Sequence, residues 1–325
     1  MLAIIIGLTG YGIKSLSESP LVDPLLIAII LGIIGGTVIG KHKRFKPGFV
    51  FAPSIFIPVG IVFYAARNLN FVKFAELETG MSALLVVVVL VYFIVIILLG
   101  RLLKQRKQIT YLTATGSAIC GASAIAITSP AVDAKPDDTS ISLLSVALIS
   151  LFGFAVILPF FSALLNITGR TYSLLSGSVL QFTGLVKVAV QNIPYLKTEL
   201  SEKELLQLAL SVKAMRYLGL LVAIPLFASF IKKKLYIPWI LWLFLGSGLV
   251  GTWIYMNNAN YYSFTLLPYI KPIHSISWSI AMAAIGLNAD IRELLSNNGT
   301  KALVMAFAGF SAATATFFIG LYLIQ

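Results

Sequence analysis

Three cationic side chains, Lys187, Lys213 and Arg216, interrupt stretches of sequence that are otherwise apolar enough to lie inside a membrane. A charge in hydrocarbon is costly, so such a side chain usually faces a cavity, a partner or a transport pathway. Lys213 and Arg216 are three residues apart and therefore share one helix face. Because no Asp or Glu falls within an apolar stretch, we expect their partner to be a diffusible anion or backbone carbonyls. Lys187 lies close enough to the end of its stretch to extend to the interface instead.

The composition of the chain indicates a membrane protein. It has 325 residues, 58% hydrophobic and 11% charged, whereas an average soluble domain is roughly 45–50% apolar and about 25% charged. Too few polar side chains remain to cover a soluble enzyme. The single cysteine, Cys120, excludes an internal disulfide, and two histidines argue against a histidine-rich metal centre. We therefore expect no cofactor, no metal site and no nucleic-acid partner.

Apolar stretches between charged or Pro/Gly/Asn-rich breaks predict an all-α polytopic protein with about eleven transmembrane helices. A bilayer core about 30 Å thick needs roughly 20 apolar residues as a helix. The first stretch is short enough to be a half-helix. The predicted spans are approximately 1–14, 23–40, 48–66, 80–100, 109–131, 140–165, 171–193, 205–231, 237–256, 270–288 and 300–324.

The basic residues of the loops predict the orientation. With the N-terminus inside, the inner loops hold the clusters 41–46, 101–107 and 232–234 together with Arg170. The outer loops hold half as many cations and most of the acids, among them those of the loop 133–138. This asymmetry follows the positive-inside rule. The basic clusters could also bind lipid headgroups or a partner, but anchoring the topology explains them more simply.

Two segments rich in small polar residues predict interrupted helices. Residues 113–125 hold Gly116, Ser117, Cys120, Gly121 and Ser123, and residues 273–288 hold Ser277 and Ser279. Such residues allow close helix packing, or an unwound stretch whose half-helix N-termini face an anion.

By this count of spans, each interrupted helix is the fourth of a five-span unit, and the two units have opposite orientation. The sequence thus predicts an extra span over 1–22 and an inverted repeat of five-helix units over 23–165 and 171–325. A third polar patch, 176–187, places Gln181 near mid-span, where it either bonds a neighbouring helix or contacts substrate.

At these residues the chain resembles the sulfate exporter family of YeiH-type integral membrane proteins. Gly116-Ser-Ala-Ile-Cys-Gly-Ala-Ser-Ala matches its GxSICGASA motif, and Val212-Lys-Ala-Met-Arg resembles its VKLxR helix. Ile237-Pro-Trp, Gly60-Ile-Val and the segment 281–292 resemble further family segments. The resemblance covers most of residues 45–310. It departs at the family's GxAIHDT, where Gln181 and Phe182 replace a His–Asp pair. If that pair carries protons or contacts substrate in relatives, proton coupling at this position is lost here.

The resemblance implies a fold related to bile-acid/sodium and sodium/proton carriers, with crossed broken helices, an elevator-like core and a cytoplasmic (inner) membrane location. We therefore expect a secondary transporter of a small anion, sulfate-like, sulfonate or carboxylate. The substrate site is expected to comprise Ser117, Cys120, Gly121, Ser123, Gln181, Lys213, Arg216, Ser277 and Ser279.

Other functions stay open at this stage. The same cations suit a passive anion channel, and carbonyls at broken helices suit a sodium-coupled organic-anion symporter. A scaffold without transport is a further alternative, while an enzyme is not expected because no nucleophile–base or metal constellation occurs. The substrate, the direction of transport, the coupling ion (Na⁺ or a proton) and assembly as a homodimer are left open.

Overall fold

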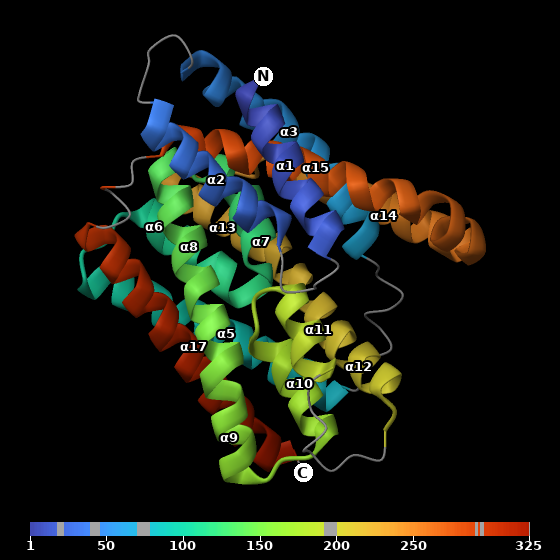
Figure 1. Ribbon diagram of the computed structural model, residues 1–325. Helices are drawn as coiled ribbons and strands as arrows, with labels where there is room; N and C mark the ends of the chain where they lie inside the picture. Colours follow the sequence, from blue (N-terminus) through green and yellow to red (C-terminus); the bar gives the residue numbers. More distant parts are fainter. Residues whose placement is uncertain are drawn as a thin grey trace.

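The computed structural model describes residues 1–17, 23–39, 46–69, 79–191, 200–289, 292 and 296–324, and these form an all-α structure (Figure 1). Among them, 6 helices are long and apolar enough to cross a membrane. They are Pro47–Asn68, Gly80–Leu102, Pro136–Leu165, Glu202–Lys232, Trp239–Asn257 and Asn297–Leu323. This agrees with a helical, multi-pass membrane protein.

One group of helices packs around α15 and α3. It consists of α1 (Leu2–Ser17), α2 (Pro24–Ile39), α3 (Lys46–Asn68), α14 (Trp239–Asn257) and α15 (Leu267–Asn288). Glycines make the close approach feasible. A Cβ at Gly32 would lie 2.5 Å from the Ala283 carbonyl oxygen, and one at Gly60 would lie 2.1 Å from the Trp278 ring. We call these five helices the outer group.

The remaining helices form a second group, the core group, around two short helix pairs. Its long members are α5 (Thr79–Leu102), α8 (Pro136–Phe152) continued by η2 (Gly153–Ile157) and α9 (Leu158–Leu165), α12 (Glu202–Met215) continued by η3 (Arg216–Leu218) and α13 (Gly219–Lys232), and α17 (Asn297–Ile324). α17 packs along α5 and α8 (Figure 1). A short π-helix, η4 (Tyr261–Leu266), joins α14 to α15.

The first helix pair, hairpin 1 (residues 107–131), enters the core group and returns to the same side. It consists of α6 (Lys107–Thr115), the π-helical turn η1 (Gly116–Cys120) and α7 (Ala122–Ala131). At its beginning, Arg106 Nη1 lies 3.2 Å from Asp138 Oδ1, at the start of α8. At its end, Asp133 pairs with Lys232, the last residue of α13. Both ends therefore lie beside the basic clusters 101–107 and 232–234.

Gly121 is the residue at which hairpin 1 reverses. Its φ of 64° and ψ of −123° belong to a region that only glycine occupies without strain. The Gly121 N–H donates to the Gly116 carbonyl at 2.9 Å, which closes the π-helical turn. Only after this residue does the chain restart as α7.

The second helix pair, hairpin 2 (residues 169–191), enters from the opposite side. It consists of α10 (Gly169–Val179) and α11 (Thr183–Gln191), which are separated by extended backbone at Leu180. α10 follows α9, and both lie at the end of the molecule away from α6 (Figure 1). α10 and α11 both pack on α12. Gly177 lies against Ala209, and Leu180 lies level with Lys213, so α10 and α12 run parallel.

The structure contradicts the predicted crossings at 109–131 and 171–193, the predicted sides of the loop 133–138 and Arg170, and the predicted break in 273–288. Residues 109–131 and 171–193 do not each cross the membrane, because each divides into helices of 9 to 11 residues that reverse. As a result, the loop 133–138 lies beside the 101–107 cluster and not opposite it, and Arg170 lies opposite. The helix over 273–288 is not broken, since α15 is continuous from Leu267 to Asn288.

The placement of these loops can be checked by cysteine labelling. In a Cys120→Ala background, we expect Lys135→Cys to react with a membrane-impermeant maleimide from the same side as Lys233→Cys. Arg170→Cys and Lys203→Cys should react only from the other side. All four positions are exposed. Labelling of Lys135→Cys from the same side as Lys203→Cys would mean that residues 109–131 and 171–193 each cross the membrane. That result would contradict the hairpins.

Candidate functional site

The tips of the two hairpins are held together by two buried cations. Lys213 Nζ donates to the carbonyls of Ile119, at 2.8 Å, and Leu180, at 2.7 Å. Arg216 donates to four carbonyls, with Nε to Ala118 at 2.8 Å, Nη2 to Ser117 at 2.8 Å, and Nη1 to Leu180 at 2.8 Å and Gly177 at 3.3 Å. Both side chains are 1% exposed. We call this arrangement the carbonyl clamp.

The carbonyl clamp compensates the negative ends of two half-helices. The carbonyls at the C-terminus of a helix carry partial negative charge and lack intrahelical partners. Those that end the first half of each hairpin turn towards Lys213 and Arg216. Of the two partners expected from the sequence, backbone carbonyls are therefore the ones that the structure places on these cations.

The second half of each hairpin begins at the same place and presents its N-terminus. α7 starts with Ala122 and Ser123, and α11 starts with Thr183 and Gly184. Ser123, Thr183 and Gly184 are half-buried. The first N–H groups of a helix are unpaired within it and attract anions. The tips thus combine neutralised C-termini with two N-termini of positive partial charge.

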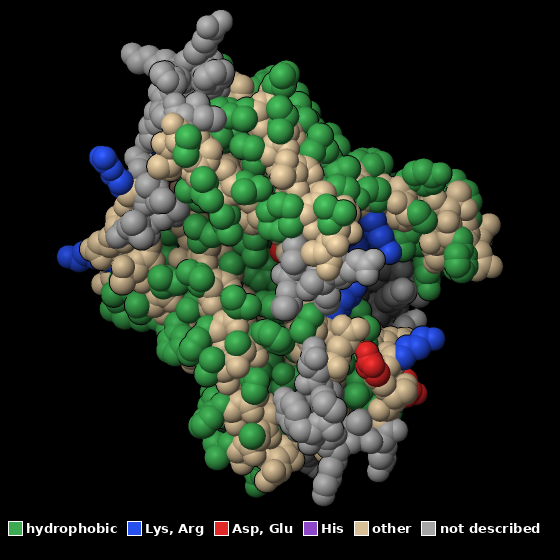
Figure 2. Space-filling view, viewed as in Figure 1, with side chains coloured by type: hydrophobic (Ala, Val, Ile, Leu, Met, Phe, Trp, Pro, Cys, Tyr) green, Lys and Arg blue, Asp and Glu red, His purple; other side chains and the backbone are tan. Residues whose placement is uncertain are grey.

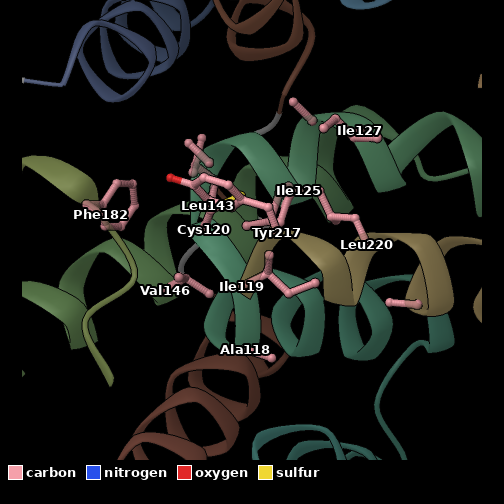
Figure 3. Close-up of a cluster of buried hydrophobic side chains, with 14 of the residues drawn as sticks. Ala118, Ile119, Cys120, Ile125, Ile127, Leu143, Val146, Phe182, Tyr217 and Leu220 are labelled. Atoms are coloured by element: carbon pink, nitrogen blue, oxygen red, sulfur yellow. The ribbon is translucent and has the colours of Figure 1, made fainter. Parts of the chain in front are cut away.

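Phe182 separates the two tips. A Cβ on Gly121 would lie 2.9 Å from the end of the Phe182 ring. Figure 3 shows this ring at one edge of the cluster of buried side chains. The contact fixes the spacing of the hairpins.

Two aromatic side chains of the outer group and one of the core group close one side of the tips. Tyr64, on α3, lies beside the side chains of Cys120 and Ser123. Its ring is 5.7 Å from that of Tyr217 and 4.7 Å from that of Trp278, measured between centroids. All three rings are buried. They form what we call the aromatic barrier.

A cavity of about 630 Å³, the basic vestibule, reaches the other side of the hairpin 2 tip. Thr183 and Gly184 line it together with Lys14, Arg67 and Lys187. Lys14 and Arg67 lie close enough to Lys187 to repel its positive charge. The vestibule also contains Asp23, whose Oδ1 accepts the Leu25 N–H at 2.8 Å at the start of α2. Figure 2 shows Lys and Arg side chains in a recess between the ends of the outer group and the part of the core group labelled α11 and α12 in Figure 1.

The structure brings together most of the predicted site residues but gives them different roles. Ser117 contributes its carbonyl to the carbonyl clamp, while Cys120, Gly121 and Ser123 lie at the hairpin 1 tip. Gln181 faces the core group, where its Nε2 donates to the Tyr92 hydroxyl at 3.1 Å.

Two predicted residues do not join the others. Ser277 and Ser279 are buried on the continuous α15, on either side of Trp278. Trp278 Nε1 donates to the Ile57 carbonyl at 3.2 Å, so this part of α15 packs on α3. The hydrogen bonds of Lys213 and Arg216 all end on hairpin carbonyls.

The sequence did not single out Tyr64 and Tyr217, or Lys14 and Arg67, as parts of a site, whereas Thr183 lies in the polar patch 176–187. Tyr64 and Tyr217 lie far apart in the chain, and an aromatic residue in an apolar stretch carries no signal of its own. Lys14 and Arg67 were interpreted as ordinary loop charges. In the described part of the chain, no group of three or more His, Cys, Asp or Glu side chains could hold a metal ion.

Comparison with known proteins places the chain in a family. The family model described as conserved hypothetical protein 698 matches residues 1–306. The chain belongs to this family. It is 26% identical to a UPF0324 membrane protein of Archaeoglobus fulgidus over 317 residues, which is 97% of this chain and 89% of that protein. A UPF0324 membrane protein of Bartonella henselae is 28% identical over 306 residues, 90% of this chain and 82% of the relative. No solved structure matches the chain.

Membership of the conserved hypothetical protein 698 family agrees with a helical membrane protein. The relatives' names give a membrane location and no activity. The sulfate exporter resemblance therefore contributes only to the proposal below.

Proposed function

We propose that the protein is a secondary transporter of a small anion in the cytoplasmic membrane. The observation that carries this proposal is the position of the α11 N-terminus, at Thr183 and Gly184, in the basic vestibule. A helix N-terminus stabilises negative charge, and Lys14, Arg67 and Lys187 raise the local concentration of anions. Among the described residues that line the vestibule, the one acid, Asp23, already accepts backbone N–H groups of α2.

The dimensions of the vestibule favour a small solute such as sulfate, a short sulfonate or a carboxylate. Its volume of about 630 Å³ falls in the ordinary range for small-molecule sites. Hairpins 1 and 2 contain no Asp or Glu, so no carboxylate at the tips would repel the anion. The hydroxyls of Thr183 and Ser123 also lie at the tips, where they contact the Tyr217 and Tyr64 hydroxyls, respectively.

One-sided access to the tips supports a carrier over a passive channel. The vestibule reaches the hairpin 2 tip from one side, whereas the aromatic barrier closes the other side. A second cavity, of about 400 Å³, lies beyond the barrier and is lined by Ser54, Ser129 and Asn288. Ile57 lines this cavity, and its carbonyl accepts a hydrogen bond from Trp278 Nε1, so the cavity borders the aromatic barrier. Two cavities separated by a closed layer are what alternating access requires.

The carbonyl clamp favours transport without sodium coupling. In a sodium-coupled carrier, carbonyls of broken helices hold the cation. Here Lys213 and Arg216 hold the carbonyls of residues 117–119, 177 and 180. These fixed cations would repel a Na⁺ ion at the same carbonyls. The sodium-coupled organic-anion symporter is therefore the less supported candidate.

The proposed transport fold contains two inverted hairpin units. Hairpin 1 enters from the side of the 101–107 cluster, and hairpin 2 enters from the opposite side. By the positive-inside rule the basic side, with the N-terminus, is cytoplasmic. The core group would then move against the outer group, as in an elevator mechanism, and carry both tips with it.

Anion flux into proteoliposomes tests this function. With sulfate, a short alkyl sulfonate and a dicarboxylate as probes, we expect saturable uptake of at least one that does not require a sodium gradient. Lys187→Gln should reduce flux at low substrate concentration by about tenfold, because a vestibule cation governs capture of the anion. Lys203→Gln, an exposed lysine at the start of α12, is the matched control.

Two results would reject the proposal. Absence of flux for every anionic probe, in vesicles that contain folded protein, would remove the transport function. Steady single-channel currents, with flux far above carrier turnover, would select the passive channel.

A further inference from the structure

An apolar groove runs between α5 and α13 on the lipid-facing surface of the core group. Its volume is about 570 Å³. Its walls are almost entirely apolar and include Val86, Leu90 and Phe93 of α5, and Val222, Leu226 and Phe227 of α13. Val86, Leu90 and Val222 are exposed. At its deep end α5 touches α12, where the Ser82 hydroxyl lies 3.6 Å from the Met215 sulfur.

The other end of the groove leads to a basic pocket of about 400 Å³. Arg101, Lys104 and Lys107 line it together with Thr110 and Tyr111, and no acidic side chain is among the described residues of its wall. The three cations are exposed. This places a cluster of positive charge where α5 leaves the apolar layer.

The groove and the basic pocket form one continuous feature. Ile97 lines both. Tyr111, in the wall of the pocket, stacks on Phe227, in the wall of the groove, with ring centroids 4.5 Å apart and planes within 6°. Phe227 in turn packs on Phe93 at 5.7 Å between centroids. A single molecule with a charged end and an apolar tail could therefore contact both.

We propose that this feature binds one anionic phospholipid, with its phosphate on Arg101, Lys104 and Lys107 and an acyl chain in the groove. Basic pockets at the end of membrane helices attract anionic headgroups, and the apolar walls match an acyl chain. The cations distinguish a lipid from a second copy of this chain. A second copy would bring its own clusters 101–107 and 232–234 to the same level of the membrane, where like charges repel.

The deep end of the groove connects this lipid to the transport core. Arg216, Met215 and Gly219 line it, and Arg216 is a member of the carbonyl clamp. An acyl chain in the groove would therefore support the helix that holds both hairpin tips. We expect the bound lipid to raise the thermal stability of the core group.

Native mass spectrometry of the purified full-length protein tests the site directly. After addition of phosphatidylglycerol or phosphatidylcholine, we expect one phosphatidylglycerol to be retained with about tenfold preference. The variant Arg101→Gln/Lys104→Gln/Lys107→Gln should lose this preference. Lys233→Gln/Lys234→Gln, which alters exposed cations outside the pocket, should keep it. Val222→Trp, which fills the groove at an exposed position, should weaken binding of both lipids.

The possible results separate this proposal from the transport function, because no flux is measured. Equal retention of phosphatidylglycerol by the triple variant and the parent would overturn the site. A dimer that Val222→Trp converts to monomer, whatever lipid is present, would show that a second copy occupies the groove and would also overturn it. If the triple variant folds poorly, the loss of lipid preference in Lys104→Gln alone provides the test, since Lys104 lies outside the helices.

Discussion

Replacement of Arg216 by leucine is expected to destabilise the whole core group. The guanidinium donates to carbonyls of both hairpins, at Ser117 and Ala118 on one side and Gly177 and Leu180 on the other. Removal of the guanidinium takes the donor away from buried carbonyls, and each buried acceptor left unsatisfied costs about 1–3 kcal/mol. The residues that carry the four carbonyls are themselves buried. The two tips should then separate.

Thermal unfolding of the purified protein, followed by intrinsic fluorescence, measures this effect. We expect Arg216→Leu to lower the midpoint more than Lys213→Met, since Lys213 donates to two carbonyls. Arg216→Lys keeps the charge but not the planar fork of donors. Its unfolding midpoint should lie between those of Arg216→Leu and the parent. Arg170→Gln, at an exposed position, controls for loss of a positive charge.

The result also decides how Arg216 acts in transport. If Arg216→Leu kept the stability of the parent and weakened only anion binding, the guanidinium would contact the anion and the carbonyl clamp would not hold the tips. If stability falls and the residual folded protein still binds an anion, the N-termini of α7 and α11 bind it without this residue.

Local signals in the sequence were sufficient to predict the buried cations and the break in hairpin 1. The rarity of charge in apolar stretches drew attention to Lys213 and Arg216, and small polar residues marked 116–123. These features depend on composition over a few residues. They do not depend on where the rest of the chain lies.

The reversal of the hairpins was not predicted, because the length and hydropathy of a segment do not show whether the chain crosses the membrane or turns back within it. Two half-helices and their connection are together as long as one span, so 107–131 resembles a crossing helix. The acids of the loop 133–138 strengthened this error, since acids without partners are typical of outer loops. In the structure Asp138 pairs with Arg106, and Asp133 with Lys232. Their partners lie in distant parts of the sequence.

Small residues were also ambiguous between packing and interruption. In α15 the segment around Ser277 and Ser279 belongs to a continuous helix that packs closely on α2 and α3. In hairpin 1 the same residue types accompany a true break. The difference lies in Gly121, whose backbone conformation no other residue adopts at low cost, and a sequence does not display a φ angle.

Replacement of Gly121 by alanine is the second change for which we expect a large effect, and it acts through two separable causes. The backbone at φ 64° and ψ −123° costs a residue with a Cβ roughly 1–3 kcal/mol. The new methyl would also lie 2.9 Å from the Phe182 ring, and overpacking of a filled core typically costs about 1–3 kcal/mol. Both should lower the unfolding midpoint and shift the tips apart.

A double-mutant cycle separates the two causes. Phe182→Ala removes the ring and should restore in Gly121→Ala only the steric part of the loss, because the backbone strain stays. Gly246→Ala, with nothing within 4 Å of the added Cβ, is the matched control and should unfold like the parent. Full restoration by Phe182→Ala would mean that the turn tolerates a side chain, and that contact with Phe182 alone fixes the tips. A loss in Gly121→Ala no larger than in Gly246→Ala would contradict both causes, and with them the role of this glycine in reversing hairpin 1.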